Sequence, residues 1–396
     1  MKELKFSYQT TMKACFVGYV VQAIVNNFAP LLFVTFQNTY DISLSKITLL
    51  ITFNFGVQLL TDLAASAYVD RIGYRISIVA AHVFSALGFL FLVVLPEIMN
   101  PFAGILIAVS VYAVGGGLIE VLISPIMESC PTENKETAMS LLHSFYCWGH
   151  VGVVLLSTIF FQIVGISNWR VLALLWAVIP ILNGLIFAKT PIAPLISEEE
   201  SGLTLKELFK NKVFWILMVM MVCAGASEQG VSQWASVFAE KGLGITKTLG
   251  DLAGPMAFAI MMGSARAIYG KYGEKMNLDV FMKLSTLLCV GSYLTIALVP
   301  SPVISLIGCA VCGFSVGIMW PGTFSLASGA IRNGGTAMFA MMALAGDMGC
   351  GGGPSLVGAI AGLMDNHLKS GIFAATVFPI LFICSLYYLR SLKKKR

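Results

Sequence analysis

Charged side chains are scarce in this sequence. Asp, Glu, Lys and Arg make up 11% of its 396 residues, whereas a typical soluble domain carries roughly 25%. Hydrophobic residues make up 57%, and the mean hydropathy is +0.85. A water-soluble fold cannot bury this much apolar surface, but a bilayer accommodates it, because one helix of about 20 apolar residues crosses the hydrocarbon core. The composition therefore excludes a soluble globular protein and predicts a membrane protein.

Breaks rich in charged residues, Pro or Gly separate twelve apolar runs, each long enough to cross a bilayer. Lipid offers no partner to backbone N–H and C=O groups, and these runs are too long for barrel strands, so helices are expected. The first run is too long for the core of a signal peptide and has no small-residue cleavage site, so we expect it to be retained. We predict an all-α membrane protein with twelve transmembrane helices near residues 12–36, 46–69, 76–96, 102–127, 137–165, 169–188, 213–238, 249–269, 278–299, 302–329, 334–363 and 372–390.

Lysines and arginines are unevenly distributed between the expected loops. If the N-terminus is cytoplasmic, all but five of the 25 fall on the cytoplasmic side, which is the bias typical of multi-pass proteins. We therefore expect a protein of the cytoplasmic (inner) membrane with both termini in the cytoplasm. The net charge of +5 is explained by this bias without a nucleic-acid partner. The five outer residues are Lys46, Arg170, Lys241, Lys247 and Lys369.

Two segments 200 residues apart repeat one pattern. Residues 66–75 read SAYVDRIGYR and residues 266–275 read RAIYGKYGEK, so that basic residues and a glycine coincide. Gly149 and Gly349 have the same spacing. The sequence thus predicts two six-helix bundles, residues 1–188 and 213–396, joined by a polar cytoplasmic linker over residues 189–212. Parallel repeats of this kind are typical of major facilitator transporters, whose halves rock around a central site.

The first of these segments resembles the cytoplasmic signature loop of the major facilitator superfamily. Asp70, Arg71, Gly73 and Arg75 match its Asp-Arg-x-Gly-x-Arg pattern. An acid and two bases at a helix end can hold two halves together, and the glycine permits a tight turn. We expect these residues to form a cytoplasmic gate.

We count four carboxylates inside the expected spans: Asp62, Glu120, Glu228 and Asp347. A carboxylate in hydrocarbon costs at least about 2.5 kcal/mol, so it normally faces a cavity and has a function. No Lys or Arg lies comparably deep in the same spans, so we expect acids without a basic partner, which suit proton uptake and release. All four are candidate proton-coupling residues.

Amide and aromatic side chains are the other polar groups in the spans. Asn54, Gln58 and Asp62 recur every four residues and therefore share one helix face. Amides can bond the hydroxyls of a neutral solute and aromatic faces can stack on its apolar side; the alternative is that the amides only join helices. The predicted substrate contacts are Gln22, Asn26, Asn27, Asn54, Gln58, His143, Tyr146, Gln229, Gln233, Trp234 and Trp320.

Three helices resemble those of the fucose–galactose–glucose:proton symporters. Residues 23–37 contain an A-x-x-N-N motif followed by F-Q, residues 115–125 read GGGLIEVLISP, and residues 320–326 read WPGTFSL. This resemblance implies that Glu120 is the coupling glutamate and that His143 and Tyr146 contact sugar. Pro30 replaces the family's aspartate in the first helix, so Asp62 is the candidate to take over its role, and Ser124 replaces an asparagine.

The sequence favours a proton-coupled importer of a sugar or similar polar metabolite that works by alternating access. Its partners would be a small-molecule substrate, a coupling cation (H⁺, or alternatively Na⁺) and the lipid bilayer, and a monomer is expected. The alternatives are an exporter of amphipathic drugs or other metabolites by cation antiport, and a membrane receptor that has kept the fold. No enzyme, cofactor or metal site is predicted: outside the spans there is no nucleophile–base pair or metal-ligand spacing, and Cys309 and Cys312 lie in an apolar run without a second ligand pair.

Overall fold

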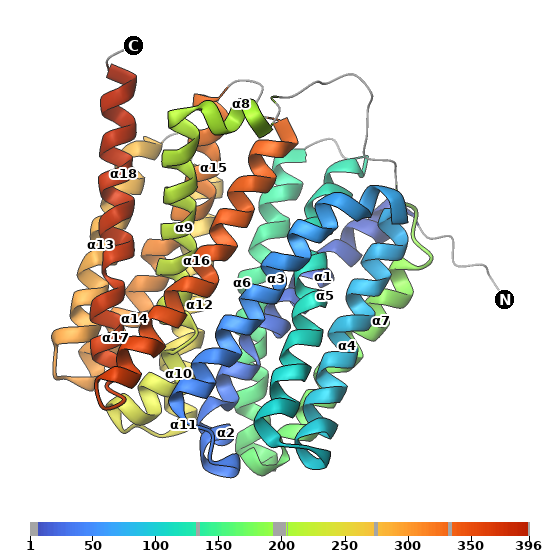
Figure 1. Ribbon diagram of the computed structural model, residues 1–396, viewed down its shortest axis with the longest axis vertical. Coiled ribbons are helices and arrows are strands. Elements are labelled where there is room, and N and C mark those ends of the chain that lie inside the picture. The colour runs from blue at the N-terminus through green and yellow to red at the C-terminus, as the bar shows by residue number, and fades with distance from the viewer. Residues whose placement is uncertain are drawn as a thin grey trace. The chain divides into compact units, whose positions relative to one another are not determined.

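The computed structural model describes residues 7–131, 135–192, 203, 205–272, 276–331 and 335–394, and every regular element in these ranges is a helix (Figure 1). Two of the elements, η3 and η4, are short π-helices, and η1 and η2 are 3₁₀ turns. The elements are α1 (Tyr8–Asn27), η1 (Ala29–Leu32), α2 (Phe33–Tyr40), α3 (Leu44–Ile72), α4 (Tyr74–Ile98), α5 (Pro101–Ser129), α6 (Lys135–Val164), η2 (Ile166–Asn168), α7 (Trp169–Phe187), α8 (Leu205–Lys210), α9 (Lys212–Ser232), α10 (Ala235–Val237), η3 (Phe238–Gly242), α11 (Lys247–Asp251), η4 (Leu252–Met256), α12 (Ala257–Tyr272), α13 (Leu278–Leu298), α14 (Pro302–Val316), α15 (Met319–Ala330), α16 (Gly335–Leu363), α17 (Leu368–Ala375) and α18 (Val377–Lys394).

All twelve expected segments fall on helices, so the all-α membrane fold class is confirmed. Ten helices in the described ranges are long and apolar enough to cross a membrane. Two expected segments are not among these ten. Residues 249–269 are divided into α11, η4 and α12, with Pro255 inside η4, and residues 334–363 form α16. The segment expected at 12–36 is also interrupted, because Pro30 has no N–H to donate and the chain turns through η1 there.

The chain divides into two compact units. The first comprises Met1–Ile42 and Phe53–Glu198, and the second comprises Ser43–Thr52 and Glu199–Arg396. Helix α3 belongs to both units, since its first residues group with the second unit and the remainder with the first. The two units are described separately below.

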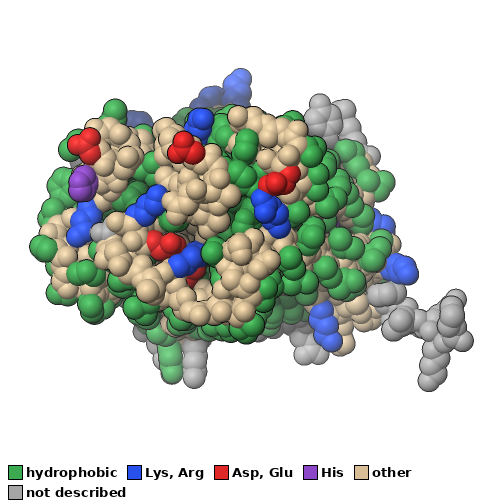
Figure 2. Space-filling model, turned by 90° about the horizontal axis from the view of Figure 1, so that it is seen from below, with side chains coloured by type: hydrophobic (Ala, Val, Ile, Leu, Met, Phe, Trp, Pro, Cys, Tyr) green, Lys and Arg blue, Asp and Glu red, His purple; other side chains and the backbone are tan. Residues whose placement is uncertain are grey.

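The helices expose many large apolar side chains that a soluble protein would bury. Helix α7 exposes a stripe of Leu, Ile and Val, while the opposite face of the same helix buries Asn183, which is 1% exposed. A water-soluble helix would show the opposite pattern, so this stripe is suited to lipid. On the face shown in Figure 2, the few charged side chains are scattered and hydrophobic side chains line much of the edge. The stripe consists of Val171, Leu174, Leu175, Val178, Ile181, Leu182 and Leu185.

Glycines permit close contact between helices at equivalent places in the two units. In the first unit, a Cβ atom on Gly149 of α6 would lie 2.9 Å from the Cβ of Ala23 on α1. In the second unit, a Cβ atom on Gly349 of α16 would lie 2.0 Å from the carbonyl oxygen of Val222 on α9. Small residues allow transmembrane helices to approach in this way. The glycines related by the sequence repeat therefore have the same packing role.

Candidate functional site

A chain of amide side chains connects three helices of the first unit. Gln22 Nε2 on α1 donates to Gln58 Oε1 on α3 at 3.0 Å and to Glu120 Oε2 on α5 at 3.0 Å. Gln58 Nε2 in turn donates to Asn26 Oδ1 at 2.9 Å, and Asn54 Nδ2 donates to the same oxygen at 3.3 Å. Five residues that the sequence predicted for the site are thus joined, from the acid Glu120 to Asn54.

The run of three glycines in α5 provides the room for this chain. A Cβ atom on Gly116 would lie 3.1 Å from Gln22 Oε1 and 3.2 Å from Gln58 Oε1. A Cβ atom on Gly117 would lie 2.9 Å from Asp62 Oδ1. Asp62 is 9% exposed and, one helical turn beyond Gln58, continues the polar stripe of α3. The Gly-rich sequence therefore brings α5 against the polar faces of α1 and α3.

Aromatic groups lie on either side of this chain. The Tyr19 hydroxyl and Ser124 Oγ are 2.9 Å apart, and the His143 ring lies 5.3 Å from the Tyr19 ring between centroids. Asn27 Nδ2 donates to the Tyr146 hydroxyl at 3.5 Å. His143 and Tyr146 thus contact residues of α1 as well as their own helix, α6.

The second unit contains a different arrangement around Glu228. Arg266 Nη2 on α12 lies 3.2 Å from Glu228 Oε2 on α9, and the two side chains are only 16% and 9% exposed. Gln229 Nε2 donates to Glu228 Oε1 at 3.2 Å, and Gln233 Nε2 donates to Gln229 Oε1 at 2.9 Å. The expectation that Glu228 has no basic partner is therefore wrong. The repeat over residues 266–275 favours a cytoplasmic position for Arg266, but α12 continues through this residue and its side chain meets α9.

Two predicted tryptophans of the second unit lie against the backbone of α16. Trp234 is 0% exposed, and its Nε1 donates to the carbonyl oxygen of Pro354 at 2.9 Å. The ring of Trp320 lies against Gly346, where a Cβ atom would come within 2.1 Å of the indole. Asp347, the next residue, is 6% exposed. The indole N–H of Trp234, just beyond the end of α9, is thus used in packing against α16.

The expected cytoplasmic gate is described only in part. Gly73 separates α3 from α4 and has φ +93°, a conformation that favours glycine. Arg75 Nη1 donates to the carbonyl oxygens of Phe187 at 3.2 Å and Ala188 at 2.9 Å, at the end of α7. The side chains of Asp70 and Arg71 lie outside the described residues. Arg75 therefore links this loop to the last helix of its own unit.

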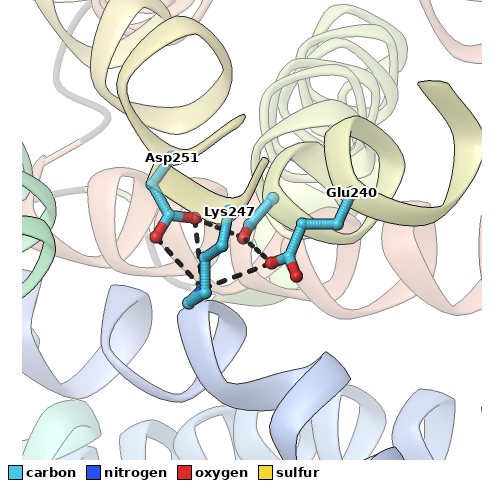
Figure 3. A network of polar contacts seen from close by, with 4 residues as sticks. Glu240, Lys247 and Asp251 are labelled. Carbon is cyan, nitrogen blue, oxygen red and sulfur yellow. Dashed lines mark hydrogen bonds and ion pairs between the residues drawn. The ribbon is translucent and has the colours of Figure 1, made fainter. Parts of the chain in front are cut away.

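A second polar network lies in the second unit, between η3 and α11 (Figure 3). Lys247 Nζ lies 3.3 Å from Glu240 Oε1 and 3.0 Å from Asp251 Oδ2. Ser236 Oγ donates to Asp251 Oδ1 at 2.5 Å. Asp251 lies inside the segment expected at 249–269 and is completely buried, so the count of four carboxylates in the spans is wrong because it omits this acid.

The sequence analysis also missed some of the partners of the predicted residues. Tyr19 could have been found from its spacing, because it lies one turn before Gln22 and Ala23 on the face that contacts α5 and α6. Arg266 has no comparable signal, since its pairing depends on how α12 is oriented against α9. Within the described ranges, no group of three or more His, Cys, Asp or Glu side chains is arranged to hold a metal ion.

Comparison with known proteins adds the family. The model of the Major Facilitator Superfamily matches residues 15–354, while no curated protein sequence matches the chain. Among solved structures, the chain is similar to a bacterial homolog of the human lysosomal transporter Spinster in an inward-facing, unoccupied conformation, with 14% identity, a TM-score of 0.76 and 98% of each chain covered. It is also similar to the E. coli fucose:proton symporter, with 15% identity, a TM-score of 0.68, and 97% of this chain and 99% of that chain covered.

At these identities the structural likeness concerns the fold and does not distinguish one branch of transporters from another. The family match is more informative, since it extends over most of the chain and over helices of both units. The buried amides and acids in helices long enough to cross a membrane agree with this family match. The chain therefore belongs to the Major Facilitator Superfamily and is a multi-pass secondary transporter of a small molecule.

Proposed function

We propose that this protein is a proton-coupled symporter that imports a sugar or a related small polar metabolite by alternating access. The observation that carries the proposal is Glu120, a carboxylate on a membrane-spanning helix that accepts a hydrogen bond from Gln22 within a chain of amides. A carboxylate in such surroundings costs free energy, so its presence points to a function. The resemblance of residues 115–125 to the fucose–galactose–glucose:proton symporters supports the same role.

The contacts of Glu120 favour a proton over Na⁺ as the coupling cation. Hard cations take oxygen ligands, whereas Gln22 directs its amide nitrogen toward the carboxylate. In the orientation that the structure shows, this nitrogen stabilises the charged form of Glu120 and does not ligate a metal cation. Among the four predicted acids we therefore propose Glu120 as the proton site. Asp62 and Asp347 are secondary candidates, and Glu228, which is paired with Arg266, is the weakest.

The chemistry of the lining favours a hydroxylated neutral solute. Amides can donate and accept hydrogen bonds, and Gln22, Asn26, Gln58 and Asn54 supply both from one face of the first unit. Tyr146 adds an aromatic group beside Asn27. In the second unit we propose Gln229, Gln233, Trp234 and Trp320 as further substrate contacts.

We also propose that the protein lies in the cytoplasmic (inner) membrane with both termini in the cytoplasm, as the distribution of positive charges predicts. We propose a monomer as the functional unit. The loop around Asp70, Arg71, Gly73 and Arg75 would then be a cytoplasmic gate. Reporter fusions at the C-terminus and at Lys369, which is expected to lie outside, would have opposite localisation if this topology is correct.

The test is solute uptake into liposomes containing the purified protein, with a proton gradient imposed and L-fucose, D-galactose and D-glucose offered as substrates. Uptake should rise when the exterior is acidified, and at least one sugar should cause measurable proton entry. Glu120→Gln should abolish the effect of the gradient because the amide cannot release a proton, while exchange of solute without a gradient persists.

Glu97→Gln is the matched control, since Glu97 is half-exposed and pairs with Arg170 at the end of α4. This variant should keep gradient-driven uptake. A full response to the gradient in Glu120→Gln would remove Glu120 from the mechanism. Extrusion of cationic dyes with no uptake of any sugar would replace the proposal with the alternative of a drug exporter.

A further inference from the structure

We propose that protonation of Glu120 reverses the hydrogen-bond direction of the whole amide chain, with Gln22 as the residue that transmits the change. This inference rests on the proposed function and specifies how the proton would alter the substrate site. Gln22 is then a positioning residue. At the far end of the chain, whether Asn54 presents its oxygen or its nitrogen depends on the protonation state of Glu120.

The present direction of the chain is defined by its donors. Gln22 uses one nitrogen for both of its bonds, to Gln58 Oε1 and to Glu120 Oε2. Asn26 accepts hydrogen bonds from Gln58 and from Asn54 through the same oxygen. Within the described residues, Gln22 Oε1 and Asn54 Oδ1 are buried acceptors without a hydrogen-bond partner. The first amide of the chain, Gln22, and the last, Asn54, therefore each have an unused acceptor oxygen.

Protonation makes this direction unfavourable. A carboxylate only accepts hydrogen bonds, but a neutral carboxyl carries an O–H that must donate. A proton taken from water onto the carboxylate oxygen that faces Gln22 would point at the amide nitrogen, which is also a donor. Rotation of the Gln22 amide by half a turn presents Oε1 instead, so its unused acceptor takes the new bond.

The same rotation must then pass along the chain. Gln22 Oε1 would meet Gln58 Oε1, so Gln58 turns to donate its nitrogen. Its oxygen then faces Asn26 Oδ1, so Asn26 turns and donates to Gln58 and to Asn54. The side chains share four hydrogen bonds before the change and four after it, while Gln58 Nε2 gives up its 3.4 Å bond to the backbone carbonyl oxygen of Asn54. Since amide oxygen and nitrogen have nearly the same size, the backbone need not move, and Gly116 leaves both Oε1 atoms space.

The functional result appears at Asn54. With Glu120 charged, Asn54 holds an unused acceptor; with Glu120 neutral, the nitrogen takes that position and offers a donor. A solute oxygen that accepts a hydrogen bond would therefore bind better once Glu120 is protonated. Proton and solute would then bind in a fixed order without direct contact between Glu120 and the solute.

Other titratable groups lie on the elements packed against α5. They face different partners: Tyr19 of α1 contacts Ser124, His143 of α6 contacts Tyr19, and His82 of α4 contacts Asn183. Tyr146 of α6 contacts Asn27. Asp62 of α3 lies beside Gly117 and is the one that could compete for the proton, so the experiment includes its amide variant.

The experiment is a pH titration of the purified protein in lipid, followed by infrared difference spectroscopy with ¹³C at the side-chain carbonyl of asparagine. In the unaltered protein, a carboxyl band should appear on acidification and a labelled asparagine band should shift with the same midpoint. Glu120→Gln should lose both signals, whereas Asp62→Asn should keep both. Asn54→Ala should reduce the shifting asparagine band, whereas Asn168→Ala, which removes an exposed asparagine, should not.

The decisive variant is Gln22→Met, which keeps the size of the side chain but removes its hydrogen bonds. In this variant the carboxyl band of Glu120 should persist while the asparagine shift is lost. Gln58→Met should give the same result, and it tests the relay independently if Gln22→Met does not fold. An asparagine shift that survives in both variants, or that is missing from the unaltered protein, would overturn the relay alone. Absence of a titrating carboxyl band attributable to Glu120 would instead contradict the proposed proton site.

Discussion

Lys247 is the common partner of two acids, and one of them, Asp251, is completely buried. Removing the shared base leaves a buried carboxylate without a counter-charge, which costs about 3–5 kcal/mol for a fully buried pair. Because Lys247 is one-fifth exposed, we expect the lower end of this range for Lys247→Met. The measurement is the midpoint of thermal unfolding in detergent.

Lys241→Met is the control for this prediction, because Lys241 is an exposed lysine in the same short segment. It should leave the unfolding midpoint unchanged. The double variant Lys247→Met/Asp251→Asn should recover much of the loss, since the buried charge is then absent. Equal midpoints for the two lysine variants would mean that the network of Figure 3 contributes little to stability.

Cys130 follows the end of α5 and is expected to resist alkylation. The thiol is 1% exposed and donates to the carbonyl oxygen of Ile126 at 3.3 Å. Burial raises the pKa of Cys130 to about 11, so at pH 7.4 the reactive thiolate is depleted on the order of 100-fold relative to an ordinary cysteine. Peptide mass spectrometry after N-ethylmaleimide treatment should find Cys130 unmodified until the protein is denatured or the pH approaches 11. Rapid labelling of the folded protein at pH 7.4 would contradict this.

At this scale the sequence predicted which polar residues lie inside the spans better than it predicted their partners. The four-residue spacing was sufficient to place Asn54 and Gln58 on one face of α3, whereas the structure was needed to show that this face meets Gln22 and Asn26 of α1. The pairing of Glu228 with Arg266 could not be predicted, because it depends on the rotation of α9 about its axis. Every residue of α9 from Cys223 to Ser232 is buried, so its sequence shows no exposed face from which that rotation could be inferred.

Among the elements, α9 and α16 illustrate how glycine sets the distance between helices. A Cβ atom on Gly349 would lie 2.0 Å from the carbonyl oxygen of Val222 and 2.8 Å from the backbone nitrogen of Ala226, neither of which can move independently of α9. Gly349→Ala should therefore separate the helices and lower the free energy of unfolding by about 1–3 kcal/mol or more. Thermal unfolding monitored by tryptophan fluorescence measures this.

Gly352 provides the matched control on the same helix, because a Cβ atom there would meet nothing within 4 Å. Gly352→Ala should be neutral or slightly stabilising, since alanine favours a helix over glycine by about 1 kcal/mol. The close contact between α9 and α16 would be shown to be unimportant if both variants unfolded at the same temperature.

The existence of the helices was predictable and their interruptions were less so. Length and hydropathy are sufficient to identify a span, and Pro30 explains in retrospect why residues 12–36 are not one helix. The π-helices η3 and η4 give no sequence signal of comparable strength. They lie on either side of α11, and the missed acid Asp251 lies directly before η4.

For the whole molecule, the grouping of residues 43–52 with the second unit leads to a prediction about a divided chain. Fragments 1–198 and 199–396 should co-purify when they are expressed together. The first fragment contains the beginning of α3, which packs against α16 in the second fragment. A Cβ atom on Gly358 would lie 2.1 Å from Thr48 Oγ1. Gly358→Leu in the second fragment should therefore reduce recovery of the first.

Gly362→Leu, one turn further along α16, should not have this effect, since a Cβ atom at Gly362 has no neighbour within 4 Å. Quantifying the fragments after affinity purification through a tag on the second one is the measurement. Equal recovery with both leucine variants would show that the start of α3 does not hold the fragments together.

The boundary between the units therefore falls inside a continuous helix, between Thr52 and Phe53. If the units change their relative orientation during a transport cycle, the two ends of α3 cannot both keep their neighbours while the helix stays straight. Gly56, one turn beyond the boundary, has open space where a side chain would be and lowers the resistance of the helix to bending. The proposed alternating access therefore requires the turn of α3 that contains Gly56 to bend in each transport cycle.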